Sequence, residues 1–298
     1  KCKIDLCICN RFTNFAPVIV SFFALLTRSF YMTQVAFIYD FDGTLSPRNM
    51  QEYDFLRAVG IDDAQAFWKE CNLLQERQDA NGILCSMRMM LEKSREKHVP
   101  VTRETFVRYG KSVELYRGVL EWFALTRQMG KEMGLDIRHY INSSGMTEII
   151  EGTPIAHEFD AIYASRYMYD ENGVAVWPAT AADFTSNTQD LWMINKGILR
   201  ISDAARINQP MAQENRPVPF SHMLYFGDGE TDVPSMQVVK MFGGHAFAVY
   251  NPDDVRKQQL AEQLVAENRA HFALPADYSK QSKLMEQVRE VLTKITKE

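Results

Sequence analysis

The sequence predicts an α/β protein built on an open parallel sheet, with a long helical segment inserted near its start. Three observations support this prediction. The apolar run over residues 35–39 has the length of a buried strand and stops at two aspartates, Asp40 and Asp42. Helical spacing of apolar residues fills much of positions 48–117. After this segment, strand and helix patterns follow one another along the chain.

The inserted segment contains four stretches in which apolar residues recur every three or four positions: 51–59, 64–78, 83–97 and 103–115. Asn81-Gly82 separates the second stretch from the third, and Val99-Pro100 separates the third from the fourth. We therefore expect four helices here.

The chain then returns to the sheet. We expect a helix over 118–133, a strand over 137–142, a short helix over 146–151 and a strand over 160–165. Residues 167–177 carry Asn172-Gly173 in their middle, which indicates a β-hairpin, because this dipeptide favours tight hairpin turns.

The last part of the chain follows the same alternation. We expect a helix over 196–207, a proline-containing loop over 208–220, a strand over 223–227, a last clear strand over 245–249, and helices over 253–269 and 279–297. The loop is long for a connection inside a compact domain.

Bulk properties limit the possible functions. A chain of 298 residues allows one large α/β domain and a small second one. Its 33 basic and 38 acidic residues give a net charge of −5, so we expect no nucleic-acid partner. The five cysteines form no disulfide framework, and Cys2, Cys7 and Cys9 lack a fourth ligand for zinc.

Residues 1–31 differ from the rest of the chain. The mostly apolar stretch 15–26 is too short to span a bilayer. We interpret 1–31 as an appended segment outside the folded domain, and we expect a cytoplasmic protein without membrane attachment. A signal peptide or membrane anchor over 15–26 is the alternative.

Asp40 and Asp42 come directly after a strand, where chemistry gathers in open parallel sheets. Two carboxylates so close repel each other unless they share a cation or a proton. A magnesium ion and a phosphorylated substrate would explain the pair. The alternative is a strand-ending Asp that caps the next turn, which accounts for only one of the two.

Residues 40–44, Asp-Phe-Asp-Gly-Thr, resemble the first motif of the haloacid dehalogenase superfamily of phosphohydrolases. Ser143-Ser144-Gly145, after the second strand, resembles the second motif, and Lys196 the third. Gly227-Asp228 with Asp232, after a further strand, resembles the fourth. The four motifs stand in the family's order, from residue 35 to residue 232.

The resemblance implies a doubly wound, Rossmann-like parallel sheet formed by residues 32–47 and 118–298. Residues 48–117 occupy the position of the first cap of the family, and a helical cap there closes over the site. This arrangement would place residues 1–31 outside both units.

The resemblance also assigns roles. Asp40 would be the nucleophile and a ligand of Mg²⁺, although a ligand role alone is the alternative. Asp42 would be the general acid and then the base, and its backbone carbonyl would bind the metal. The presence of Asp42 separates phosphatases from dehalogenases in this superfamily.

Asp228 and Asp232 would complete the magnesium site, because carboxylate oxygens suit this ion. Asp232 also precedes Val233-Pro234, so it can equally be the N-cap of a helix.

Ser143 would bind a phosphate oxygen, helped by the backbone N–H groups of Ser144 and Gly145 at a helix start, and an N-cap role is its alternative. Lys196 would neutralise the phosphate and the nucleophile. A surface lysine is the alternative for Lys196, but the macrodipole disfavours lysine in a first helical turn.

The function implied is Mg²⁺-dependent hydrolysis of a small phosphorylated metabolite through an aspartyl-phosphate. Family members that act on phosphoserine carry a Glu soon after the first motif, and Glu52 is the candidate here. Three alternatives stay open: a phosphotransferase or phosphomutase of the same superfamily, a non-catalytic binding protein with this fold, and a membrane-associated protein.

Overall fold

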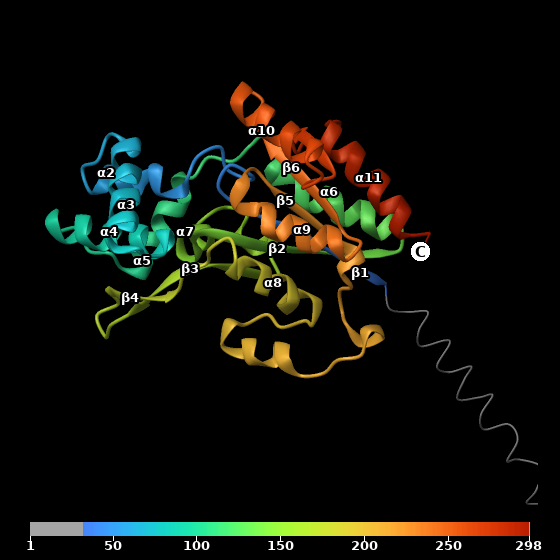
Figure 1. The fold of residues 1–298 in the computed structure, drawn as a ribbon, viewed down its shortest axis with the longest axis horizontal. Helices are drawn as coiled ribbons and strands as arrows, with labels where there is room; N and C mark the ends of the chain where they lie inside the picture. Colours follow the sequence, from blue (N-terminus) through green and yellow to red (C-terminus); the bar gives the residue numbers. More distant parts are fainter. Residues whose placement is uncertain (1–31, 298) are drawn as a thin grey trace, which may run out of the picture.

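The computed structural model describes residues 32–297, so the expectations for residues 1–31 lie outside the described part of the chain. Figure 1 shows a central sheet with helices on either side of it. Its seven strands are β1 (Thr33–Tyr39), β2 (Leu135–Met146), β3 (Ala161–Tyr169), β4 (Ala175–Thr180), β5 (Met223–Gly227), β6 (His245–Tyr250) and β7 (Phe272–Pro275).

The strand order is β4-β3-β2-β1-β5-β6-β7. Each neighbouring pair from β3 to β7 is parallel, and β4 is antiparallel to β3. The order reverses at β1, which pairs with β2 on one side and with β5 on the other. In open α/β sheets such a reversal leaves a crevice at the carboxyl ends of the strands, where ligands bind.

Both faces of the sheet are covered. In β1, Val35, Phe37 and Tyr39 belong to one apolar cluster, and Ala36 and Ile38 belong to the other. Helices α6 (Val119–Glu132) and α11 (Lys283–Ile295) pack into the first cluster. Helices α8 (Ser186–Asn195), α9 (Val233–Met241) and α10 (Val255–Ala266) pack into the second. The expected doubly wound α/β fold is confirmed.

The inserted segment is helical. After a turn of 3-10 helix over Met50–Glu52 come α2 (Asp54–Ala58), α3 (Ala64–Gln78), α4 (Gly82–Glu96) and α5 (Arg103–Tyr109). Figure 1 shows these helices gathered at one end of the sheet, beside the hairpin of β3 and β4. Asn81 caps α4 by accepting hydrogen bonds from the backbone of Ile83 and Leu84, which explains the break before this helix.

The inserted helices are packed tightly onto the sheet domain. Next to α5, a Cβ atom on Gly110 would lie 2.1 Å from the carbonyl oxygen of Ile149 in α7 (Thr147–Glu151). A Cβ on Gly152 would lie 1.8 Å from the carbonyl oxygen of Val107. The two backbones therefore approach as closely as only glycine permits. The apolar cluster that contains Val35 runs on without a break into the inserted helices.

Two expectations for secondary structure are wrong, and one expected strand is longer than predicted. The α-helix expected over 196–207 does not form. Instead, α8 stops at Asn195, Gly197 has φ +66°, and a 3-10 helix follows over Ile201–Asn208. The strand expected over 160–165 continues into the hairpin as β3. The sheet also ends with β7 rather than β6, because the four-residue β7 is too short to give a periodic pattern.

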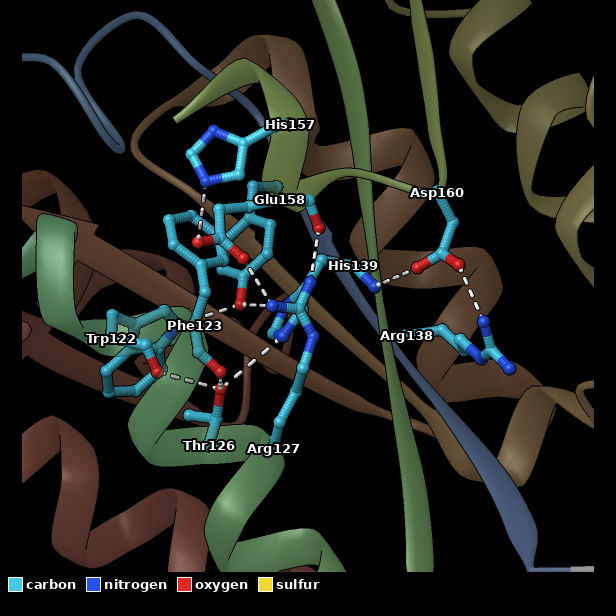
Figure 2. A network of polar contacts seen from close by, with 10 residues as sticks. Trp122, Phe123, Thr126, Arg127, Arg138, His139, His157, Glu158 and Asp160 are labelled. Carbon is cyan, nitrogen blue, oxygen red and sulfur yellow. Dashed lines mark hydrogen bonds and ion pairs between the residues drawn. The ribbon is translucent and has the colours of Figure 1, made fainter. Parts of the chain in front are cut away.

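A buried histidine joins β2 to β1 and α6. His139 is fully buried, its Nδ1 lies 3.1 Å from the hydroxyl of Tyr39, and its Nε2 lies 3.4 Å from Oγ1 of Thr126. Because Thr126 Oγ1 donates to the carbonyl oxygen of Trp122 at 2.8 Å, it is left to accept from Nε2–H. Figure 2 shows His139 and Thr126 together with the half-buried ion pairs of Arg127 with Glu158 and Arg138 with Asp160.

Neutral His139 therefore stabilises the fold. Burial and the charge of Arg127 hold the pKa of His139 well below 6.5. The unfolded chain takes up a proton near pH 6.5 that the folded chain does not bind. The contribution of neutral His139 to the free energy of unfolding is thus complete above pH 6.5. It is lost as pH falls below this value, by at most about 1.4 kcal/mol per pH unit.

We expect His139→Gln to flatten this acid dependence. Unfolding free energies measured between pH 7.5 and pH 5.5 should fall less steeply for the variant than for the parent, whatever its stability at neutral pH. His157→Gln is the control, because it makes the same change at a side chain that is 77% exposed. Equal slopes for the parent and His139→Gln would contradict this interpretation.

Candidate active site

A cavity of about 700 Å³ lies at the carboxyl ends of β1, β2 and β5, where the inserted helices meet the sheet. Its lining includes seven residues of the motifs: Asp40, Asp42, Gly43, Ser143, Ser144, Gly145 and Asp228. Glu52, Trp68 and Ile83 line it from the inserted segment. Residues far apart in the sequence thus share one opening.

Three carboxylates form the acidic centre beside this cavity. Asp40, Asp228 and Asp232 each offer an oxygen within 4.8 Å of the others. Asp40 follows β1 directly, and its backbone N–H donates to the carbonyl oxygen of Phe226 at 2.9 Å, which ties the end of β1 to β5. Burial, followed by the charges of Asp232, Asp228 and Asp42, raises the pKa of Asp40 well above its ordinary value.

The chemistry of this donor set fits Mg²⁺. All three side chains offer hard oxygen ligands, which this ion prefers. Their ionised forms repel one another in a buried place, so a divalent cation would relieve a cost that the bare protein carries. Asp42 lies outside this group of three, so its side chain is left for another role.

Asp42 is held by the start of the inserted segment. The backbone N–H of Met50 donates to its Oδ1 at 2.9 Å. Burial raises the pKa of Asp42, and this hydrogen bond opposes the rise. Gly43 has φ +80°, and a Cβ there would lie 2.3 Å from Oδ2 of Asp228. Glycine at this position lets the first and fourth motifs meet.

Asp232 is fixed by hydrogen bonds at both oxygens. Its Oδ2 accepts from the backbone N–H groups of Asp228 at 3.1 Å and Gly229 at 3.3 Å, and its Oδ1 accepts from the Tyr225 hydroxyl at 2.9 Å. A Cβ on Gly227 would lie 2.3 Å from Cγ of Asp232, so glycine makes room for this carboxylate. The side chain therefore supports the strand end rather than capping α9, although Asp232 is the residue before that helix.

Ser143, Ser144 and Gly145 lie in the last, irregular part of β2, where the register to β3 shifts between Asn142 and Met146. The expectation of a helix start here is wrong, because α7 begins only at Thr147. The backbone N–H of Gly145 donates to Oγ of Ser143 at 3.1 Å. This N–H is therefore already engaged, while the three residues line the cavity as a group.

Lys196 lies away from the acidic centre. Its Nζ donates to the backbone carbonyl oxygens of Ile207 and Gln209, so it holds the 3-10 helix that follows α8. It is not among the residues that line the cavity, and the structure does not bring it together with the other motif residues.

Lys257, which none of the sequence motifs includes, is the basic residue that contacts the acidic centre. Its Nζ lies 2.6 Å from Oδ2 of Asp228, and it lines the cavity. Burial opposes its charged form, but the charge and hydrogen bond of Asp228 outweigh this and raise the pKa of Lys257. Lys257 stands in the first turn of α10, where the macrodipole disfavours lysine. This unfavourable position of a lysine at a helix start is the sequence signal that could have indicated a functional role for Lys257.

One part of the cavity wall comes from the inserted segment. Glu52 Oε1 accepts from Nε1 of Trp68 and from Nδ2 of Asn49, both at 2.7 Å. Gln51, which is 7% exposed, lines the cavity beside it. Two hydrogen bonds thus fix the Glu52 carboxylate where it borders the cavity.

Within residues 32–297, no helix has the length and apolar character needed to cross a membrane.

The fold and the site together define a doubly wound α/β protein with an acidic, metal-competent centre at its switch point. Comparison with protein families is consistent with this class. Residues 37–237 match the family described as haloacid dehalogenase-like hydrolase. The chain belongs to this family, and it is accordingly a hydrolase of the haloacid dehalogenase type.

Individual relatives are distant. A protein of Borreliella burgdorferi described as uncharacterized is 26% identical over 285 residues, which cover 86% of this chain and 95% of that one. A substrate-bound phosphoserine phosphatase has a TM-score of 0.52 at 12% identity, over 87% of this chain and 99% of that one. A HAD family hydrolase from Salmonella enterica serovar Typhi has a TM-score of 0.51 at 14% identity, over 87% and 76%. At these identities the solved structures establish the fold alone.

Proposed function

We propose that the protein is a Mg²⁺-dependent phosphatase that hydrolyses a small phosphorylated metabolite through an aspartyl-phosphate on Asp40. The observation that carries the proposal is the buried group of Asp40, Asp228 and Asp232, with Asp42 and Lys257 at the same cavity. The structural likeness to a phosphoserine phosphatase supports a phosphorylated substrate. Mg²⁺ bound by the three carboxylates would supply positive charge for the phosphate oxygens.

In the first step, a carboxylate oxygen of Asp40 attacks phosphorus, and the bond from phosphorus to the substrate oxygen breaks. Asp42 gives its proton to the leaving alcohol. In the second step, Asp42 takes a proton from water, whose oxygen attacks phosphorus. The acyl phosphate bond breaks, which releases inorganic phosphate and restores the Asp40 carboxylate.

The surroundings of Asp42 suit this exchange. Met50 N–H holds one oxygen, Oδ1, and the other, Oδ2, lies 3.3 Å from where a Cβ on Gly145 would be. The free oxygen is thus directed toward the segment of Ser143 to Gly145, which we propose binds the phosphate oxygens. The Asp42 carboxyl group, as general acid, would therefore lie close to a phosphate group bound at this segment.

We propose that Lys257, and not Lys196, neutralises the phosphate and the nucleophile. Lys257 already pairs with Asp228 at the cavity, whereas Lys196 binds backbone carbonyl groups elsewhere. A fixed cation at the site of charge transfer stabilises the transition state without reorganisation.

Residues 48–117 form the proposed cap, and residues 32–47 and 118–297 form the proposed core. The core residues can recognise only phosphate and metal, which every phosphomonoester supplies in the same way. Discrimination between substrates then falls to cap residues that border the leaving group. Glu52, fixed by Trp68 and Asn49, is the first candidate, and it would favour a leaving group that donates hydrogen bonds.

The proposal is tested by measuring phosphate release from a set of phosphorylated metabolites, with phosphoserine among them. We expect release with Mg²⁺, loss of release with a chelator, and recovery when Mg²⁺ is restored. A phosphotransferase would instead pass the phosphoryl group to an added sugar alcohol in preference to water. If the folded protein with Mg²⁺ releases phosphate from none of the substrates, the proposal is wrong.

A further inference from the structure

A line of buried polar groups leads from the acidic centre into the second apolar cluster. The Tyr225 side chain is fully buried on β5, and its hydroxyl lies 2.9 Å from Oδ1 of Asp232 and 3.2 Å from Oδ1 of Asn142. Asn142 Nδ2 lies 3.1 Å from Oδ2 of Asp190 and 3.0 Å from the carbonyl oxygen of Asn187, both on α8. The line thus connects Asp232, at the end of a turn of 3-10 helix over Glu230–Asp232, to β5, β2 and α8.

The donors in this line allow one orientation of Asn142. Its amide hydrogens are both used by acceptors on α8, so its Oδ1 must point to Tyr225. The single hydroxyl hydrogen of Tyr225 then stands between two acceptors, Oδ1 of Asp232 and Oδ1 of Asn142. The tyrosine ring cannot turn away without leaving a buried oxygen unsatisfied, which is costly.

The far end of the line is held at a cost to stability. Asp190 is 8% exposed, and burial raises its pKa to about 7. A carboxyl group in an apolar layer is rarely retained without a partner that needs it. Here it orients the amide of Asn142, which lies next to Ser143.

We propose that Tyr225, Asn142 and Asp190 are positioning residues that hold Asp232 in the orientation needed for divalent metal binding. This inference rests on the proposed function, because it takes Asp40, Asp228 and Asp232 as the metal site. The two backbone N–H groups both donate to Oδ2 of Asp232, and Tyr225 donates to Oδ1, which leaves the second lone pair of Oδ1 to the acidic centre. Groups that orient a metal ligand in this way typically change metal affinity 10- to 100-fold.

The test is calorimetric titration of Mg²⁺ into the metal-free full chain. Tyr225→Phe removes one hydroxyl from a buried ring and should raise the Kd for Mg²⁺ about 10- to 100-fold. Tyr163→Phe is the matched control. Tyr163 is buried in the same apolar cluster, and its hydroxyl donates to the carbonyl oxygen of Ile198 at 2.7 Å, away from Asp232. We expect the Tyr163→Phe variant to bind Mg²⁺ with the same Kd as the parent.

A second pair of variants tests the far end of the line. Asp190→Asn keeps an oxygen acceptor for Asn142 and should keep the parent's Kd, whereas Asp190→Leu should weaken Mg²⁺ binding. In assays, Tyr225→Phe should need more Mg²⁺ for half-maximal rate and approach the parent's kcat at saturating Mg²⁺. A merely structural role would lower kcat or stability without moving the Mg²⁺ dependence.

The outcomes separate this inference from the proposed function. If the parent chain binds no Mg²⁺, the proposed function itself fails. If the parent binds Mg²⁺ and Tyr225→Phe binds it with the same Kd, the positioning role is overturned while the proposed function stands. Equal weakening in Tyr163→Phe would also overturn it, because any buried hydroxyl would then have the same effect.

Discussion

Asp40→Asn is expected to lower kcat by at least about a thousandfold while leaving the chain folded, because loss of a nucleophile removes a whole chemical step. An amide oxygen cannot attack phosphorus to give the acyl phosphate. Asp40 is buried among like charges that raise its pKa. Removing its charge should therefore raise the melting temperature of the metal-free protein rather than lower it.

The measurement is phosphate release under saturating Mg²⁺, together with the melting temperature in a chelator. Asp253→Asn is the matched control, since it is the same change at an exposed residue outside the cavity lining. The control should keep the parent's kcat. A kcat for Asp40→Asn within tenfold of the parent would show that Asp40 is a ligand only and that another group attacks phosphorus.

Lys257→Met is expected to lower kcat/KM by about a hundredfold, the typical effect of removing one group that stabilises transition-state charge. The same substitution at Lys196 should change kcat/KM by only a few fold. Lys257 lies 2.6 Å from Oδ2 of Asp228 at the cavity, whereas the ammonium group of Lys196 donates to the Gln209 carbonyl at 2.6 Å. Methionine preserves most of the length of either side chain and removes the charge.

The two variants are best compared on one substrate, with melting temperatures to check that both fold. The reverse ranking, with Lys196→Met the more damaged enzyme, would return the role to Lys196. It would require the segment of Ile201–Asn208 to move so that this lysine reaches the cavity.

The sequence allowed the acidic centre to be predicted because each of its parts is local. A buried strand that ends in Asp-x-Asp-Gly-Thr, or in Gly-Asp with a second Asp four residues later, can be recognised in a few residues. Parallel strands then bring their carboxyl ends to one edge, and the structure places Asp40, Asp228 and Asp232 within 4.8 Å of one another.

The basic group could not be predicted in the same way. Lys196 matched the order of the motifs, but the order does not fix where a helix stops, and α8 ends one residue before it. Lys257 reaches Asp228 from α10, so its role depends on how β6 and α10 pack beside β5. A contact between two elements that meet only in the folded protein leaves no local pattern in the sequence.

The same reasoning applies to the fold. Helices α3 and α4 were predicted closely because their apolar periodicity is long and their breaks are marked. β7 was missed because its four residues are too few to give a periodic pattern. The line from Asp232 to Asp190 was also missed, since Tyr225 and Asn142 look like ordinary strand residues and their partners are set by sheet order.

The central place of β1 in the sheet also bears on how the chain folds. Ala36 pairs with Arg138 on one side and with Met223 on the other. During synthesis, this apolar strand leaves the ribosome long before either partner strand exists. Contacts between residues so far apart in sequence slow folding and prolong the exposure of unpaired strands. Helices α3 and α4 of the inserted segment pack chiefly against each other and can form during that interval. We therefore expect aggregation during refolding to depend on the delay before β1 is paired, and a chaperone that holds β1 to help more than one that acts on the completed chain.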